Sequence, residues 1–122
     1  MSKLQKSEER EERVLAKLRE ICLALPGARE VRTWGHPTFQ AGKKSFAVLE
    51  QYNGHLCICF KATLALQQLL IEDPRFFKSP YIGHQGWVSL IADRRPNWKE
   101  VQRLVRESHS LVSLFKPRSR MA

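Results

Sequence analysis

The chain has 122 residues, of which 43% are hydrophobic, a length and composition that suit a single folded domain rather than a disordered segment. Lysine and arginine number 21 against 12 acidic residues, so the formal net charge is +9 and anionic partners are favoured. Polar residues interrupt the apolar stretches and the N-terminus is charged, which predicts a cytoplasmic protein with no signal peptide, no membrane span and no membrane partner.

The first third of the chain predicts a helix followed by extended segments. Ser7 is the expected N-cap, because the acidic residues after it complement the helix dipole. Apolar residues at helical spacing continue the pattern until Pro26-Gly27 ends it. Glu30–Trp34 then indicates a strand, Gly35-His36-Pro37 a turn, and Thr38–Gln40 an extended continuation. We expect this turn to let Trp34 and Phe39 pack.

The middle of the chain predicts a β-hairpin. Ala41-Gly42-Lys43 is a tight-turn candidate, and Ser45–Tyr52 alternates as a strand. Asn53-Gly54 follows, and this dipeptide suits a type I′ turn because both central positions need a positive φ. The partner strand is His55–Lys61, in which Cys57 and Cys59 share one face as small buried side chains.

The last third predicts a helix, two strands and a final helix. Thr63 caps the first of these helices and Asp73-Pro74 ends it. Residues 75–80 are expected as a loop, and residues 81–92 as a short strand, a glycine-flanked turn and a second strand. Asn97 opens the final helix, with Glu100 close to a capping box, and residues 116–122 form a basic tail.

These elements predict an α+β fold of two layers. The order is α-β-β-β-α-β-β-α over residues 1–122, and short turns between strands imply antiparallel pairing. We therefore expect an antiparallel sheet with helices on one face.

The chain also resembles the MmcQ/YjbR family through short motifs in a characteristic order. These motifs are Leu25-Pro26-Gly27 followed by Glu30, Gly42-Lys43-Lys44-Ser45-Phe46-Ala47, Phe60-Lys61, Asp73-Pro74, Pro80-Tyr81, Gly86-Trp87-Val88 and Glu107-Ser108-His109-Ser110-Leu111-Val112. The resemblance implies a two-layer domain with an antiparallel sheet, similar to the fold of secretion chaperones. It also implies DNA binding through a double-wing arrangement, and it supplies no catalytic residues.

Catalytic motifs are absent from the sequence. It contains no nucleophile elbow, no phosphate-binding glycine loop and no suggestive pair of carboxylates. Four histidines occur without metal-ligand spacing, and the three cysteines form no C-x-x-C. The sequence therefore predicts a non-enzymatic protein with no cofactor and no metal, and the roles of His36, His84 and His109 stay open.

Basic residues predict a nucleic-acid-binding surface. The segment from Arg94 to Ala122 contains eight Lys/Arg and two Glu, so the positive charge is concentrated there. The candidate phosphate contacts are Arg32, Lys43, Lys44, Arg94, Arg95, Lys99 and Arg103. Trp34 and Tyr81 are candidates for stacking on a base. The contribution of Lys43 and Lys44 depends on their facing the same way as Arg94 and Arg95.

The alternative function is a protein- or peptide-binding adaptor. The strands 45–52 and 55–61 carry apolar residues on both sides, so an uncovered sheet face or groove would receive a partner. The expected oligomeric state is a monomer or a weak homodimer.

Overall fold

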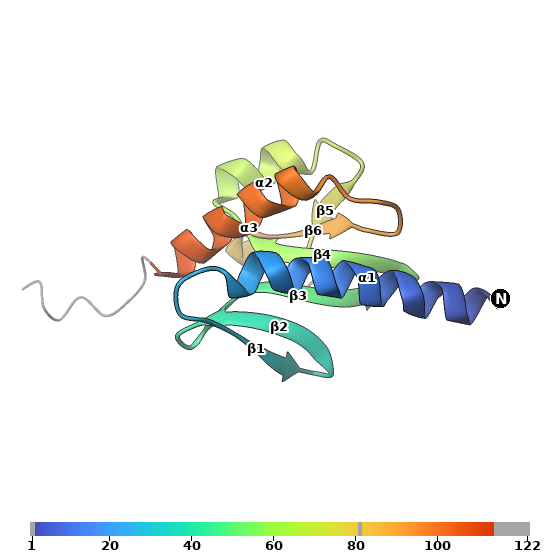
Figure 1. Cartoon of the computed structure of the whole chain (residues 1–122). Helices are drawn as coiled ribbons and strands as arrows, with labels where there is room; N and C mark the ends of the chain where they lie inside the picture. Colours follow the sequence, from blue (N-terminus) through green and yellow to red (C-terminus); the bar gives the residue numbers. More distant parts are fainter. Residues whose placement is uncertain (1, 81, 114–122) are drawn as a thin grey trace, which may run out of the picture.

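The computed structural model describes residues 2–80 and 82–113, which form three α-helices and one six-stranded sheet (Figure 1). In chain order the elements are α1 (Lys3–Leu23), β1 (Ala28–Thr33), β2 (His36–Ala41), β3 (Lys44–Tyr52), β4 (His55–Lys61), α2 (Leu64–Leu70), β5 (Phe76–Lys78), a 3-10 turn (Gly83–Gln85), β6 (Trp87–Ile91) and α3 (Trp98–Ser113). Tyr81 and the expected basic tail at 116–122 lie outside the described residues.

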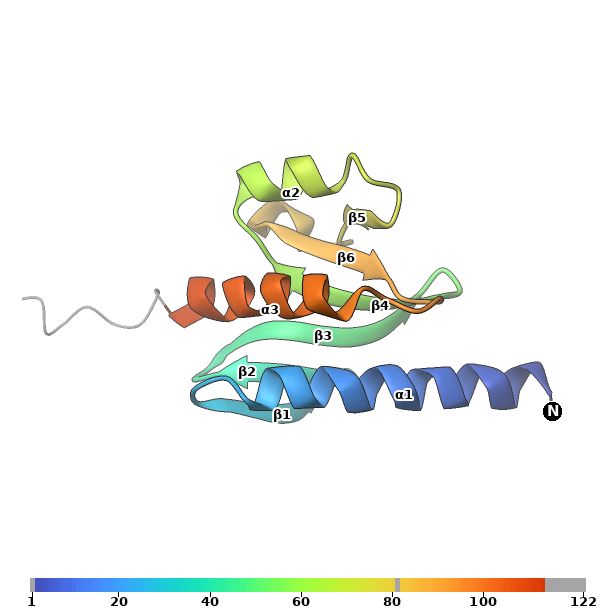
Figure 2. The same cartoon turned by 45° about the horizontal axis from the view of Figure 1, so that its top comes forward.

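The sheet is antiparallel throughout, with the strand order β1-β2-β3-β4-β6-β5. The three helices lie on one face of it (Figure 2), with α1 over β1 and β2, α3 over β3 and β4, and α2 beside β5 and β6. The predicted fold class is therefore confirmed. The structure adds detail to the strand assignments, because the extended residues after the first turn form the full strand β2, so four strands rather than three precede α2.

Strand β5 lies where the sequence predicts a loop. Phe76 is buried in the core, with its ring packed edge-on against Phe60 at 6.4 Å between centroids. This burial holds the segment against β6 as an edge strand.

Helix α1 begins earlier than predicted. Its N-cap is Ser2, not Ser7, and the Ser2 hydroxyl accepts the Gln5 amide while Gln5 Oε1 accepts the Ser2 amide, which completes a capping box. The acidic residues that suggested a first turn lie inside the helix instead. No helix in the described ranges, the 21-residue α1 included, has the apolar length needed to cross a membrane.

Side chains alternate between the two faces of the sheet with the two-residue period, and both faces of β4 are buried. In β4, Leu56, Ile58 and Phe60 belong to the main core under the helices, whereas Cys57 and Cys59 belong to a second cluster on the opposite face. Fully buried members of the main core include Leu18, Phe39, Phe46, Leu49, Val88, Val101 and Val105.

The two ends of the sheet carry different turns. The β2–β3 turn lies at the end where α1 and α3 finish, and the β3–β4 turn and the β6–α3 loop lie at the other end (Figure 2). The predicted β3–β4 hairpin is confirmed, because Asn53 and Gly54 have φ values of 51° and 80° and Tyr52 pairs with His55. Basic residues in turns at the same end of the sheet can therefore act together, whereas those in turns at opposite ends are separated by the length of a strand.

Candidate functional site

Helix α3 presents a row of cations on its exposed side. Lys99, Arg103 and Arg106 follow at i, i+4 and i+7, the spacing that places side chains on one face of a helix. The predicted N-cap is present, because the Glu100 amide donates to Asn97 Oδ1 at 3.2 Å. The opposite side of α3 is buried and consists of Val101, Leu104, Val105, Ser108, His109 and Val112.

Helix α1 carries a second row, Arg10, Arg13 and Lys17, at i, i+3 and i+7. Three hollows of about 580, 490 and 530 Å³ lie along α1, the β6–α3 loop and α3, and neighbouring hollows share lining residues. We call this row of adjoining hollows the basic trough. Its cations are Arg10, Arg13, Lys17, Arg94, Arg95, Lys99, Arg103 and Arg106.

Among residues 2–80 and 82–113, most cations of the basic trough form no ion pair. Lys17 lies 3.9 Å from Glu20, and within the described ranges no carboxylate oxygen comes within 4.0 Å of a side-chain nitrogen of the other seven. Three acids line the trough, namely Glu20, Asp93 and Glu107. The Asp93 carboxylate is already engaged by His55 and by the Leu56 amide, which donates to it at 2.7 Å. The trough therefore offers an excess of unpaired positive charge.

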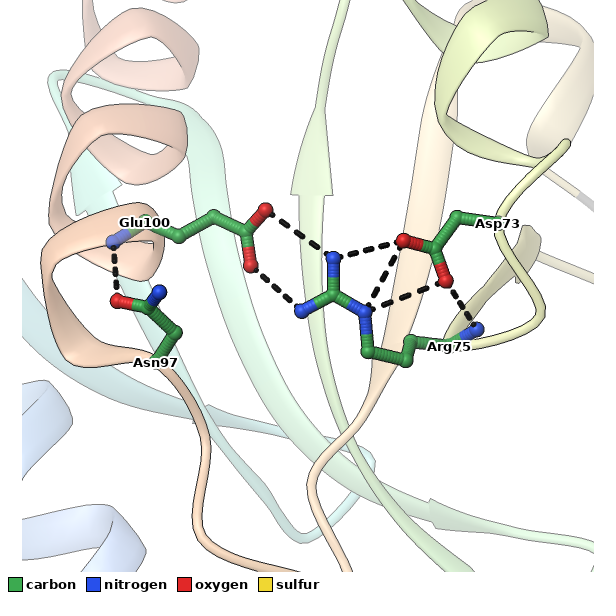
Figure 3. A network of polar contacts seen from close by, with 4 residues as sticks. All are labelled: Asp73, Arg75, Asn97 and Glu100. Carbon is green, nitrogen blue, oxygen red and sulfur yellow. Dashed lines mark hydrogen bonds and ion pairs between the residues drawn. The ribbon is translucent and has the colours of Figure 1, made fainter.

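Arg75 is basic but is not available to an anionic partner. Its guanidinium lies between two carboxylates (Figure 3), with Nη2 2.7 Å from Asp73 Oδ2 and Nη1 2.9 Å from Glu100 Oε1. The hydrogen bond from Arg75 lowers the pKa of Asp73, and the two carboxylates raise the pKa of Arg75. This network ties the start of α3 to the segment before β5, and so fixes the end of the row that begins at Lys99.

Four of the seven predicted cations come together in the basic trough, namely Arg94, Arg95, Lys99 and Arg103. Lys43 and Lys44 do not join them, because they lie at the opposite end of the sheet from the β6–α3 loop. The nine residues of β3 span the distance between these ends, about 26 Å at the usual rise per residue. Lys43 and Lys44 therefore do not lie beside Arg94 and Arg95, as their predicted contribution to the site required.

Arg32 also lies outside the basic trough. It sits at the exposed end of β1, where its Nη1 donates to the Gly35 carbonyl at 3.1 Å. Four cations of the trough were not among the candidates, namely Arg10, Arg13, Lys17 and Arg106. The helical spacing of the cations on α1 can be read from the sequence. Because acidic residues nearly balance the basic residues of the first helix, the sequence did not indicate a cationic surface there.

The open face of the sheet carries a different depression, about 560 Å³ in volume, which we call the sheet groove. Its lining residues are Thr33, Trp34, His36, Thr38, Ser45, Val48, Glu50, Gln51, Tyr52, Cys59, Ser79, Pro80, Ile82 and Trp87. Trp34 is 93% exposed, so the expectation that it packs with Phe39 is wrong for Trp34, while Phe39 is fully buried. Trp34-Gly35 forms a tight two-residue turn with φ values of 54° and 82°, and this turn points the ring away from the core.

The buried cysteines and His109 have structural surroundings. Burial raises the pKa of all three thiols, that of Cys57 to about 12, so none is a ready thiolate. His109 packs edge-on against Phe46, and its Nε2 lies 2.8 Å from the Pro26 carbonyl. In the part of the chain that the structure describes, no three His, Cys, Asp or Glu side chains gather as a metal site would require.

The comparisons with known proteins agree with this fold. The family model described as YjbR matches residues 23–111, which is most of the chain. The chain belongs to the YjbR family. No curated protein matches it.

Two solved structures share the fold of this YjbR-family protein. A crystal structure of Deinococcus radiodurans protein DR2400, with the domain DUF419, has a TM-score of 0.70 at 19% identity, over 81% of this chain and 78% of that one. A Pseudomonas syringae protein has a TM-score of 0.60 at 16% identity, over 91% of this chain and 98% of that one. At these identities the likeness concerns the fold alone.

Proposed function

We propose that this protein is a non-enzymatic nucleic-acid-binding protein whose basic trough contacts the phosphate backbone. The observation that carries the proposal is the gathering of eight cations from α1, the β6–α3 loop and α3 along three adjoining hollows. Lysine and arginine that neutralise phosphates release condensed counterions, and this release drives binding without regard to sequence.

The composition of the basic trough favours phosphate contacts over base recognition. Its polar lining is dominated by lysine and arginine, and Gln102 is its one amide side chain among the described residues. We therefore expect micromolar or weaker binding with little sequence preference at physiological salt. The raised pKa values of the buried thiols argue against a cysteine nucleophile, because nucleophilic cysteines need the thiolate form.

Fluorescence anisotropy with a short labelled DNA duplex, measured at several salt concentrations, tests this function. If roughly five to eight phosphates are neutralised, the log–log salt slope is expected between about −4 and −7. Arg103→Glu should weaken binding about tenfold and make the slope shallower by about one. Lys43→Glu makes the same change of charge at the far end of the sheet and serves as the matched control, with binding expected within about twofold of the parent protein.

Two outcomes would reject the basic trough as the interface. Absence of binding at low salt would remove nucleic acid as a partner. Equal losses for Arg103→Glu and Lys43→Glu would mean that total charge, rather than the trough, governs the interaction.

A second candidate function, a protein- or peptide-binding adaptor, is supported by the sheet groove. Trp34, at 93% exposure, and Ile82, at 39%, place apolar surface on its rim. A pull-down from lysate with and without nuclease treatment separates the two functions. A partner that survives nuclease but is lost on Trp34→Asn would favour the adaptor, whereas partners that disappear with nuclease would count against it.

A further inference from the structure

The sheet groove has a charge unlike the rest of this basic protein. Among the described residues its lining contains no lysine or arginine, and its one carboxylate is Glu50, the seventh of the nine residues of β3. No lysine or arginine of residues 2–80 and 82–113 forms an ion pair with Glu50. A half-buried carboxylate beside apolar surface, with its charge uncompensated, favours the approach of a cation.

A chain of polar contacts along the floor of the groove holds this carboxylate. The Cys59 thiol donates to Glu50 Oε2 at 3.5 Å, Cys59 Sγ lies 3.3 Å from Ser89 Oγ, and Ser89 Oγ lies 2.8 Å from Ser79 Oγ. Cys59, Ser89 and Ser79 are all buried. Burial also raises the pKa of Cys59, which keeps the thiol proton in place as a donor. The chain orients one oxygen of Glu50 and leaves the carboxylate facing the groove.

Aromatic rings supply the apolar part of the site. Trp34, Tyr52 and Trp87 line the groove, and Tyr52 is held by stacking on Phe77 with 5.9 Å between centroids. Aromatic faces attract ammonium and guanidinium groups, and Trp does so most strongly. A volume of about 560 Å³ is within the range of small-molecule sites, which combine apolar walls with a few placed polar groups.

We propose that the sheet groove binds a small organic cation, an ammonium or guanidinium group carried on an apolar body. Glu50 provides the anionic contact, and the aromatic rings enclose the apolar body. The groove lies on the open face of the sheet and the basic trough on the helical face, so this inference does not depend on nucleic-acid binding. For the second candidate function, the adaptor, it specifies an ammonium or guanidinium group as what the sheet groove would recognise.

The test uses 2-phenylethylamine as the probe and 2-phenylethanol as its uncharged counterpart, followed by amide NMR shifts on the full chain. At up to about 10 mM a site with a millimolar Kd is mostly occupied. We expect saturable shifts along β3 and around Trp34 with the amine, and at least about tenfold weaker binding of the alcohol. Glu50→Gln keeps the shape and the acceptor for Cys59, and should weaken amine binding about tenfold. Glu72→Gln, an exposed change outside the groove, should leave it unchanged.

The inference is overturned if the alcohol binds as well as the amine, if Glu50→Gln has no effect, or if the amine shifts no groove amide. The comparison of amine with alcohol uses the unaltered protein, so it decides the matter even if the Glu50 variant folds poorly. Loss of DNA binding in the trough variants leaves these outcomes unchanged, so the two proposals fail separately.

Discussion

At the scale of single residues, Trp34 combines two costly features. It is a non-glycine residue at a φ of 54°, and its ring is 93% exposed. The corresponding position in the β3–β4 hairpin is occupied by Asn53 at a φ of 51°, and asparagine tolerates this region better. Strained, exposed residues concentrate at binding sites, and Trp34 lines the sheet groove.

Replacing Trp34 tests whether its ring has any structural role. Trp34→Asn should leave the free energy of unfolding unchanged or raise it by up to about 1 kcal/mol, because the left-handed conformation is relieved and no packing is lost. Urea denaturation measures this change. Phe39→Ala, on the adjacent strand and fully buried, should cost about 3–5 kcal/mol in the same assay. A loss of more than about 1 kcal/mol in Trp34→Asn would mean that the ring packs against the fold.

At the scale of elements, α3 is anchored to the sheet by one buried hydroxyl. Ser108 Oγ accepts the Lys61 amide at 2.9 Å and donates to the Phe46 carbonyl at 2.7 Å. Ser108 is fully buried, and this pair of bonds joins α3 to β3 and β4 at once. The hydroxyl therefore helps to set the position of the cationic row on the other side of the helix.

Removing this hydroxyl should destabilise the protein. Ser108→Ala leaves the half-buried Lys61 amide and the buried Phe46 carbonyl without this partner, and should lower the free energy of unfolding by about 2–3 kcal/mol. Ser110→Ala, an exposed change in the same helix, is the matched control and should be close to neutral. Equal effects of the two substitutions would contradict the anchoring role.

The elements themselves were largely predictable from local patterns. The Asn53-Gly54 turn, the Thr63 and Asn97 caps and the buried stripe of α3 depend on neighbouring residues, so the sequence indicates them directly. The start of α1 was misplaced because a run of acids after Ser7 resembles a first turn. The strand β5 was missed because its pairing with β6 brings together segments separated in the sequence.

The candidate site was only partly predictable, because it depends on tertiary placement. The rows on α1 and α3 each follow a helical period, but their convergence requires the two helices to lie side by side. Lys43 was expected to act with Arg94, yet the length of a strand separates their turns. Sequence reveals which face of an element a residue occupies, and the sheet topology decides which faces meet.

At the scale of the whole molecule, the two faces have opposite chemistry. The helical face concentrates unpaired cations in the basic trough, and the open face holds aromatic rings around Glu50. Glu30 and Asp73 are paired outside the trough, where Glu30 accepts from Arg19 Nε at 2.7 Å and Asp73 accepts from Arg75. Asp93 lines the trough but is already engaged by His55 and the Leu56 amide. The paired acids contribute to stability, whereas most cations of the trough form no ion pair within residues 2–80 and 82–113.

These paired acids predict how stability depends on pH. Hydrogen bonds from Arg19 and Arg75 lower the pKa values of Glu30 and Asp73. Burial raises the pKa of Asp93, but the bonds from His55 and the Leu56 amide outweigh it and the net direction is downward. A carboxyl with a lowered folded-state pKa stabilises the protein above its unfolded pKa, and this contribution is lost as the pH falls through the folded value.

We therefore expect the stabilisation from these groups to be fully present and constant between pH 5 and 8, and the free energy of unfolding to decrease below about pH 4. Urea denaturation across this range measures it. Asp73→Asn should make the acid decline shallower, since one of the titrating groups is gone. An acid decline of undiminished steepness in that variant would contradict the contribution of the Asp73–Arg75 pair.

Mapping by NMR tests most directly whether the basic trough is the surface that binds nucleic acid. A DNA duplex is titrated into the labelled protein while the backbone amides are followed. We predict the largest shifts along residues 94–106 and along the α1 face of Arg10, Arg13 and Lys17, with little change at the β2–β3 turn. Shifts concentrated at Lys43 and Lys44, or none at all, would contradict it.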